Sequence, residues 1–389
     1  MGRRLRVALF SLALAPCAPG QVDDGASLAY KAEMMADSRA RAQQQGPGGP
    51  TLFGGIQLWY VANLRSEAPA DEEDFTSGFV MRRVKLGAEN RGGPIQYRVN
   101  AVFSRGNEFT FLEDAWVGLD PGADFLIRAG QFKLPLLWEE TTQWHDQLAA
   151  ERSYTNEFFS QGYSQGIDFG WAPPGDFQTH LSISDGIRTA NTDFDSMNEA
   201  DFAATARLDW LPEGRWDTVR DFTSEFGGPG ALRLGIAGHF QTAGRTGGNA
   251  DNTDIWFATG DAQWERNGWS VYGAATIQYI RFKDLDGQVI DIGLVGQAGY
   301  RYNERNEVFG RVDTVLAGDR PAETDDDQLV FTVGYNHYFD GARAKFTTDF
   351  SYFTAETLNT PFPADSGQGF LRDNGSPQLV LRIAVQLVF

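Results

Sequence analysis

The sequence predicts an all-β fold: a transmembrane, antiparallel, up-and-down β-barrel of about sixteen strands. Apolar and polar residues alternate with a period of two in repeated segments between residues 51 and 389. Short turns and long links alternate between these segments. Beyond the first twenty residues, no apolar run is long enough to form a membrane-spanning helix. These features are typical of outer-membrane barrels, whose strands face lipid on one side and water on the other.

The first residues are typical of a secretory signal peptide, which we place at 1–20. Three arginines lie within the first six residues, and a short apolar stretch at 7–15 and several small residues follow them. The only cysteine, Cys17, lies inside this segment, and the proline before it makes a poor lipoprotein site. Cleavage would leave a chain without disulfides. We therefore expect export to the cell outer membrane.

The next segment, 21–50, is separate from the alternating region. Residues 26–45 are rich in the helix-favouring residues Ala, Met, Arg, Glu and Gln, and the Gly-Pro-Gly-Gly-Pro run at 46–50 would end a helix. A short periplasmic helical extension and a disordered linker both fit this composition. We predict the helical extension and assign residues 51–389 to the barrel.

The charge balance is acidic. The chain has 33 Lys and Arg residues against 52 Asp and Glu residues, which gives a formal net charge of -19. This balance argues against nucleic acid as a partner. Much of the excess acid lies in two predicted loops, around residues 67–74 and 319–327. Neither loop has the spacing of a calcium-binding loop, so we expect no metal and no cofactor.

The alternation predicts the strands one by one, and the last is the clearest. Leu379, Leu381, Ile383 and Val385 share one face of it, and Phe389 ends it. A terminal Phe after such alternation resembles the signal that the outer-membrane barrel-assembly machinery recognises. The predicted strands are 52–64, 78–90, 95–104, 111–119, 124–133, 165–173, 176–184, 200–210, 231–243, 254–265, 269–282, 288–302, 307–317, 328–339, 343–355 and 376–389.

The links also fit a barrel. Tight turns such as 91–93 and 266–268 alternate with long links such as 134–164, as short periplasmic turns alternate with long extracellular loops. The link 211–230 departs from this rule because it is long yet falls on the periplasmic side. A merged or missed strand there stays open. Aromatic residues near strand ends suit the membrane–water interface: Trp59, Tyr60, Trp171, Trp210, Trp264, Trp269, Tyr300, Tyr302, Tyr338 and Phe339.

Two stretches carry a family resemblance. The strand at 79–87, with Arg82 and Arg83 in tandem, resembles the double-arginine strand of phosphate- and pyrophosphate-selective porins. The Asp-Ala-Trp stretch at 114–116 and the Arg-x-Gly-Gln-Phe-Lys-x-Pro stretch at 128–135 are similar to that family too. The resemblance implies a sixteen-stranded homotrimeric barrel, with the loop after the Gly-Gln-Phe-Lys strand folded into the lumen. It also implies passive passage of small solutes.

A channel of this kind needs a constriction and a pattern of charge. The candidate constriction loop is near 134–165, with Lys133, Glu139, Glu140, Trp144, His145, Asp146, Glu151 and Arg152. Alternation predicts a wall of inward-facing basic residues: Arg83, Lys85, Arg98, Arg128, Arg207, Arg233, Arg301, Arg311, Arg343, Lys345 and Arg382. The predicted inward-facing acids are Asp114, Asp168, Asp201, Asp209, Asp261, Asp291, Asp313 and Asp349. For any one arginine, a structural ion pair and a contact with solute are both open.

The expected function is passive diffusion of small hydrophilic solutes, above all anions such as phosphate. Family porins for phosphate carry lysines in the inward loop, whereas this loop is mostly acidic after Lys133, so phosphate specificity stays open. Outer-membrane lipid and small anionic or polar solutes are the expected partners.

Three alternatives remain. They are a structural or adhesive barrel without an open pore, a barrel hydrolase and a secreted β-sandwich. The four histidines, at 145, 180, 239 and 337, lie in no nucleophile motif, so we expect no enzyme.

Overall fold

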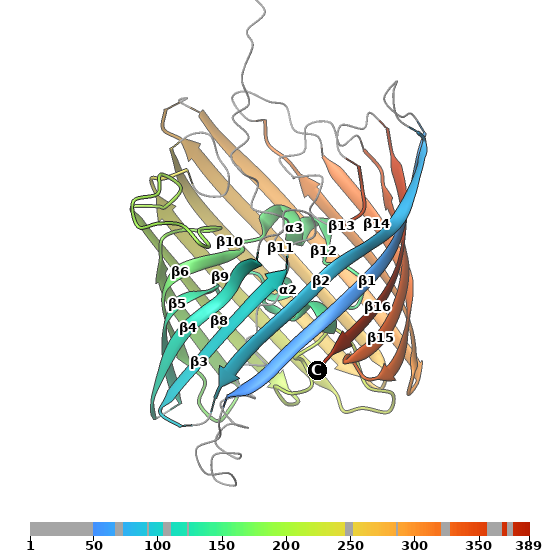
Figure 1. The fold of residues 1–389 in the computed structure, drawn as a ribbon, viewed down its shortest axis with the longest axis horizontal. Coiled ribbons are helices and arrows are strands. Elements are labelled where there is room, and N and C mark those ends of the chain that lie inside the picture. The colour runs from blue at the N-terminus through green and yellow to red at the C-terminus, as the bar shows by residue number, and fades with distance from the viewer. Residues whose placement is uncertain are drawn as a thin grey trace, which may run out of the picture.

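Sixteen antiparallel strands close into one barrel in the computed structural model of the chain (Figure 1). The structure describes residues 50–66, 73–91, 93–103, 110–122, 124–245, 252–284, 287–319, 327–355, 368–371 and 376–389. Each strand pairs with its neighbours in sequence, and β1 pairs with β16 to complete the circle. The predicted strand number and topology are therefore confirmed. The predicted signal peptide at 1–20 and nearly all of the helical extension at 21–50 lie outside the described residues.

All sixteen predicted strands are present, with ends within three residues of those expected. Their bounds are β1 Thr51–Arg65, β2 Phe75–Asn90, β3 Ile95–Phe103, β4 Thr110–Gly122, β5 Phe125–Lys133, β6 Tyr163–Trp171, β7 Phe177–Ser184, β8 Phe202–Glu213, β9 Ala231–Thr242, β10 Thr253–Arg266, β11 Trp269–Phe282, β12 Gly287–Asn303, β13 Asn306–Leu316, β14 Gln328–Asp340, β15 Ala344–Phe353 and β16 Gln378–Val388. Residues 211–230, all described, add no separate strand: β8 extends to Glu213 and the rest is irregular.

The strands bury their polar faces and expose their apolar ones. Val117, Ile236 and Val333 are 60%, 63% and 60% exposed, whereas Arg233 and Asp349 are fully buried. A soluble protein has the opposite distribution. An apolar outer surface around a polar interior is the arrangement of a barrel in lipid. Among the described residues, no helix is long and apolar enough to cross a bilayer.

Two of the β-bulges in the sheet bring adjacent charged residues to the same face. The register between β1 and β2 shifts between Gln57 and Leu58, which pair with Arg83 and Met81, so Arg82 is the extra residue of a bulge. As a result Arg82 and Arg83, adjacent in sequence, both have buried side chains. A second shift, between β3 and β4, brings Glu113 and Asp114 inward together in the same way.

The segment between β5 and β6 passes through the barrel. We call residues 134–162 the inward loop. It contains α2 (Trp138–Thr141), the 3-10 helix η1 (Trp144–Asp146) and α3 (Tyr154–Phe159). In Figure 1, α2 and α3 lie inside the ring of strands. Nearly every side chain of this loop is buried.

The aromatic residues form a belt only in part. At the end of the barrel that carries the short turns, Trp171, Trp210 and Trp269 face outward and stack on Phe125, Phe177 and Tyr300 with ring centroids 6.1, 6.0 and 4.4 Å apart. These pairs suit the membrane–water interface. Trp59 and Tyr338 were expected there too, but both are buried inside the barrel. The inward face of β1 carries Trp59 together with Gln57.

Candidate functional site: the charged barrel interior

The tandem arginines of β2 hold one carboxylate of the inward loop. Glu151 accepts a hydrogen bond from Arg82 Nε at 2.8 Å and from Arg83 Nη2 at 2.7 Å. Both guanidinium groups also lie over tryptophan rings, Arg82 over Trp59 at 5.4 Å and Arg83 over Trp144 at 5.7 Å. Charge-assisted bonds of this length are among the strongest hydrogen bonds in proteins. They fix the middle of the inward loop to the wall.

The second bulge supplies a pair of acids to the neighbouring wall. Glu113 pairs with Lys85 Nζ at 2.9 Å and accepts a bond from Asn100 at 2.8 Å. Asp114 accepts from Arg98 Nε at 3.2 Å. The basic residues predicted on β2 and β3 therefore point into the barrel, but each is paired with an acid.

On β5 to β7, Arg128 Nε pairs with Asp168 at 2.9 Å. His180 Nδ1 lies 3.1 Å from the same carboxylate, and Ser182 Oγ donates to it at 2.7 Å. A hydrolytic triad would need the serine to donate to the imidazole. Here both groups converge on Asp168 instead, so the arrangement is a buried polar network.

A four-charge network lines β8 to β10. Arg207 bonds to Asp209 at 2.8 Å and to Asp261 at 3.0 Å, and Arg233 bonds to the same two acids at 2.7 and 2.5 Å. Trp138 of the inward loop covers this network, because Arg233 lies 3.6 Å from its ring centroid. The structure thus brings together four residues that lie on three strands.

The basic residues on β13 to β16 bind backbone carbonyls. Arg311 donates to the carbonyl oxygens of Glu151 at 2.9 Å and Arg152 at 3.2 Å. Lys345 donates to that of Gln147 at 2.6 Å. Arg382 donates to Asp349 at 2.6 Å and to the carbonyl oxygen of Gln368 at 3.0 Å. Arg311 also pairs with Asp313 at 3.4 Å, so the charges of Arg311 and Arg382 are both balanced by an acid.

Hydrogen bonds and ion pairs within the inward loop also stabilise its conformation. Glu139 accepts bonds from the backbone N–H and the hydroxyl of Ser153, each 2.7 Å long. Burial raises the pKa of Glu139, while Arg311 and the two Ser153 bonds act against that rise. Lys133 pairs with Glu140 at 2.6 Å, and Arg152 donates to the carbonyl oxygen of Glu139 at 2.8 Å.

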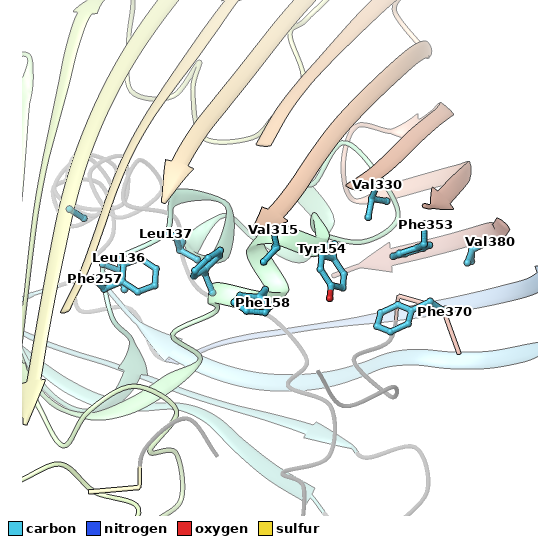
Figure 2. Close-up of a cluster of buried hydrophobic side chains, with 12 residues drawn as sticks. Leu136, Leu137, Tyr154, Phe158, Phe257, Val315, Val330, Phe353, Phe370 and Val380 are labelled. Atoms are coloured by element: carbon cyan, nitrogen blue, oxygen red, sulfur yellow. The ribbon is translucent and has the colours of Figure 1, made fainter. Parts of the chain in front are cut away.

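Apolar contacts seat the far end of the loop. Tyr154 packs edge-on against Phe353 and Phe370, with ring centroids 6.2 and 6.0 Å away (Figure 2). Phe159 packs edge-on against Phe257 at 5.8 Å. Side chains that are far apart in sequence therefore meet around α3 and fix it near β12 and β13.

Some predicted positions are not inside the barrel. Arg343 lies in the turn before β15, exposed and 3.6 Å from Asp340. Asp201 precedes β8 and is exposed. Arg301, by contrast, does face the interior: it is half-buried near the end of β12, with its guanidinium 4.5 Å from the centre of the buried Tyr338 ring. These positions fall at strand ends, where alternation no longer fixes the direction of a side chain.

The predicted set of inward charges was incomplete: besides Arg82, Glu113 and Arg188 it lacked Arg65, Glu265 and Glu307, which are buried. Arg82 and Glu113 are buried because of the bulges, which a strict period of two cannot reveal. Arg188, in the link between β7 and β8, donates to the carbonyl oxygen of Ser160 at 2.8 Å. The tandem pairs Arg82-Arg83 and Glu113-Asp114 were visible as a signal, because a strand cannot place both members of either pair on one face without a bulge.

Comparison with known proteins identifies the kind of barrel. Residues 55–284 match the family described as phosphate-selective porin O and P. Among the described residues, no group of His, Cys, Asp and Glu side chains could hold a metal ion. No curated protein matches the chain.

Solved structures share the fold at low sequence identity. An anion-selective porin from Comamonas acidovorans is 14% identical, with a TM-score of 0.62 over 88% of this chain and 99% of that one. OprB of Pseudomonas putida is 11% identical, with a TM-score of 0.58 over 95% and 99%. A trimer form of OmpT from Vibrio cholerae is 10% identical, with a TM-score of 0.56 over 88% and 100%.

Proposed function

Because this chain belongs to the phosphate-selective porin O and P family, as the match over residues 55–284 establishes, we propose that it conducts small hydrophilic solutes passively, with a preference for small anions. The family and the barrel make it an outer-membrane channel protein. The proposal adds the charge preference, with phosphate as one member of the solute class. It also includes export directed by residues 1–20, a periplasmic location for residues 21–50 and assembly into a homotrimer.

The anion preference is supported by the hydrogen-bond partners of two cations in the barrel interior. Lys345 and Arg188 donate to backbone carbonyls and interact with carboxylates, such as Glu307 and Glu157 respectively, without a described ion pair within 4 Å. Their positive charges therefore remain in the interior field. Other basic residues, such as Lys85 and Arg128, are balanced by acids. We therefore propose a weak preference for anions as a class.

Reversal potentials test the proposal. The refolded protein, checked for the barrel by heat-modifiable gel mobility, would be inserted into planar bilayers under a KCl gradient. Stable conductance steps with an anion-selective reversal potential are the expected result. Cation selectivity would overturn the charge preference. Well-folded barrels without conductance would favour the structural or adhesive barrel.

A further inference from the structure

Residues 214–230, between β8 and β9, lie at the mouth of the barrel at the end with short turns, partly exposed and partly packed into it. We call them the periplasmic segment. Its side chains Val219 and Phe222 are buried, and Phe222 packs against Tyr272 of β11 with ring centroids 4.7 Å apart. Both belong to a cluster that includes Trp138 and Leu148 of the inward loop and Phe309 of β13. The segment therefore crosses from β8 toward the opposite wall, against the inward loop.

Hydrogen bonds to three other elements hold the segment there. The Phe222 N–H donates to the carbonyl oxygen of Asp146 in the inward loop at 3.2 Å. Thr223 Oγ1 donates to Glu307 of β13 at 2.6 Å. The Gly268 N–H, in the turn after β10, donates to Ser224 Oγ at 3.2 Å. Contacts this widely spread define one docked position across the mouth.

Carboxyl groups from four elements meet at this docking surface. They are Asp221 of the segment, Asp146 of the inward loop, Glu265 of β10 and Glu307 of β13, and they interact electrostatically. Glu265 and Glu307 are only 1% and 0% exposed. Among the described contacts, neither has a cation within 4 Å. Glu307 is bound by neutral groups: Thr223, Tyr338 at 2.5 Å and Asn336 at 2.9 Å.

The other charged groups around the cluster are few. Glu225 of the segment adds a further acid. Arg220 of the segment and Lys345 of β15 supply positive charge at longer range. Arg301 of β12 lies over the ring of Tyr338. His145 lies 3.6 Å from Asp146. Acids therefore dominate the surface that the segment covers.

Ionisation of such a cluster opposes docking. Burial raises the pKa of Asp221 to about 7, with Asp146 and Glu307 adding to the rise and the Thr223 N–H and Arg220 opposing it. Release of the segment would return the carboxyl to water and lower its pKa. The docked state thus binds more protons. Its stabilisation by this group is complete at low pH and is lost as the pH rises through about 7.

We propose that the periplasmic segment is a proton-controlled gate: it stays docked across the mouth while the carboxyl cluster retains protons and is released when the carboxyls ionise. This inference rests on the proposed channel function. It assigns to the segment a role in regulating flow. The docked segment narrows the exit of the barrel, and release opens it.

The test compares three proteins at pH 5 and pH 8. Bilayer conductance would be measured for the wild type, for Asp221→Asn and for Asp217→Asn. Asp217 is the matched control because it lies in the same segment but is paired at the surface with Arg215 at 2.6 Å. We expect the open fraction to rise about tenfold or more from pH 5 to pH 8 in the wild type and in Asp217→Asn. In Asp221→Asn this ratio should fall toward one, with the open fraction staying low.

A second measurement does not depend on conductance. Ser224→Cys places a thiol on a buried position of the segment, and Asp340→Cys places one at the exposed end of β14 as the reference. Maleimide labelling at position 224, divided by labelling at 340, should rise at least several-fold from pH 5 to pH 8.

The outcomes separate the two proposals. If neither the labelling ratio nor the conductance changes with pH, the proposed gate is overturned and the proposed channel function is unaffected. A pH-dependent labelling ratio in barrels that never conduct would support movement of the segment and contradict the channel function. Equal effects of Asp221→Asn and Asp217→Asn on the pH response would overturn the role of the cluster.

Discussion

Glu151, in the middle of the inward loop, is bound by Arg83 at 2.7 Å, and Arg82 binds the same carboxylate from the adjacent position in the chain. The bulge in β2 makes this two-to-one contact possible. The position of the inward loop therefore depends on the carboxylate of Glu151. Several measurable consequences depend on this and similar contacts.

Glu151→Gln should destabilise the folded barrel by about 3 kcal/mol, because it removes the buried carboxylate that two guanidinium groups share. The measurement is the temperature at which heat-modifiable gel mobility is lost. Glu213→Gln is the control, since Glu213 pairs with Arg266 in an exposed position and should change stability by about 1 kcal/mol or less. Equal losses of stability in the two variants would contradict the role of Glu151 in fixing the inward loop to the wall.

Gly293→Ala should displace α3. A Cβ at this position would lie 2.4 Å from Phe159 Cε2 and 2.6 Å from Thr155 Cγ2, which is too close for either atom. Overpacking of this kind costs about 1–3 kcal/mol. Gly296→Ala on the same strand is the control, because its Cβ would meet no atom within 4 Å. We expect noisier single-channel current and a lower melting temperature only for Gly293→Ala.

The buried Glu139 predicts a pH-dependent loop. Because burial raises its pKa above the ordinary value, its contribution to stability is present at low pH and decreases as the pH rises through the raised pKa. Glu139→Gln cannot ionise; its single amide oxygen can accept one of the two Ser153 bonds, and its amide NH2 can donate to the Ser153 hydroxyl in place of the other. Melting curves at pH 4 and pH 8 should therefore differ less for this variant than for the wild type. An unchanged pH dependence of melting in Glu139→Gln would contradict the assignment of this effect to Glu139.

Neutralising Arg83, Lys85 and Arg128 together should shift permeability toward cations. Each is paired with an acid, so the triple Gln variant removes three positive charges from the interior while the carboxylates of Glu151, Glu113 and Asp168 remain, with Glu151 still bound by Arg82. The measurement is the reversal potential under a KCl gradient.

The matched control for this triple variant neutralises Arg215, Arg266 and Arg343, which are all exposed. It should leave the reversal potential near that of the wild type. Lys85→Gln alone offers a folding check, and its shift should have the same sign. No shift in either variant would mean that the wall charges do not face the solute path.

The strands could be predicted from the sequence because lipid and lumen impose a period of two along each of them. The same logic failed where the backbone breaks that period. Arg82 and Glu113 were missed at bulges, and Trp59 was assigned to the interface although Gln57 of the same strand shares its inward face. A bulge depends on the partner strand, which a single strand's sequence does not reveal.

The interior contacts were harder to predict than the wall. The length and position of the inward loop indicated that it enters the lumen, but not that Arg311 and Lys345 would bind its carbonyl groups. The unexplained length of the link after β8 was a useful signal, because its excess residues lie at the mouth of the barrel. The meeting of Asp221 with Glu307 depends on the closed ring of strands and could not be read from local pattern.

The seam between β1 and β16 has a consequence for biosynthesis. Eleven residue pairs, from Gly55 with Val388 to Arg65 with Gln378, join the two ends of the barrel sequence. Until β16 has been translated, β1 and β15 each present unpaired backbone groups that can recruit foreign strands. Completion of the cylinder must therefore follow synthesis, and nascent chains need protection from aggregation until their final strand arrives.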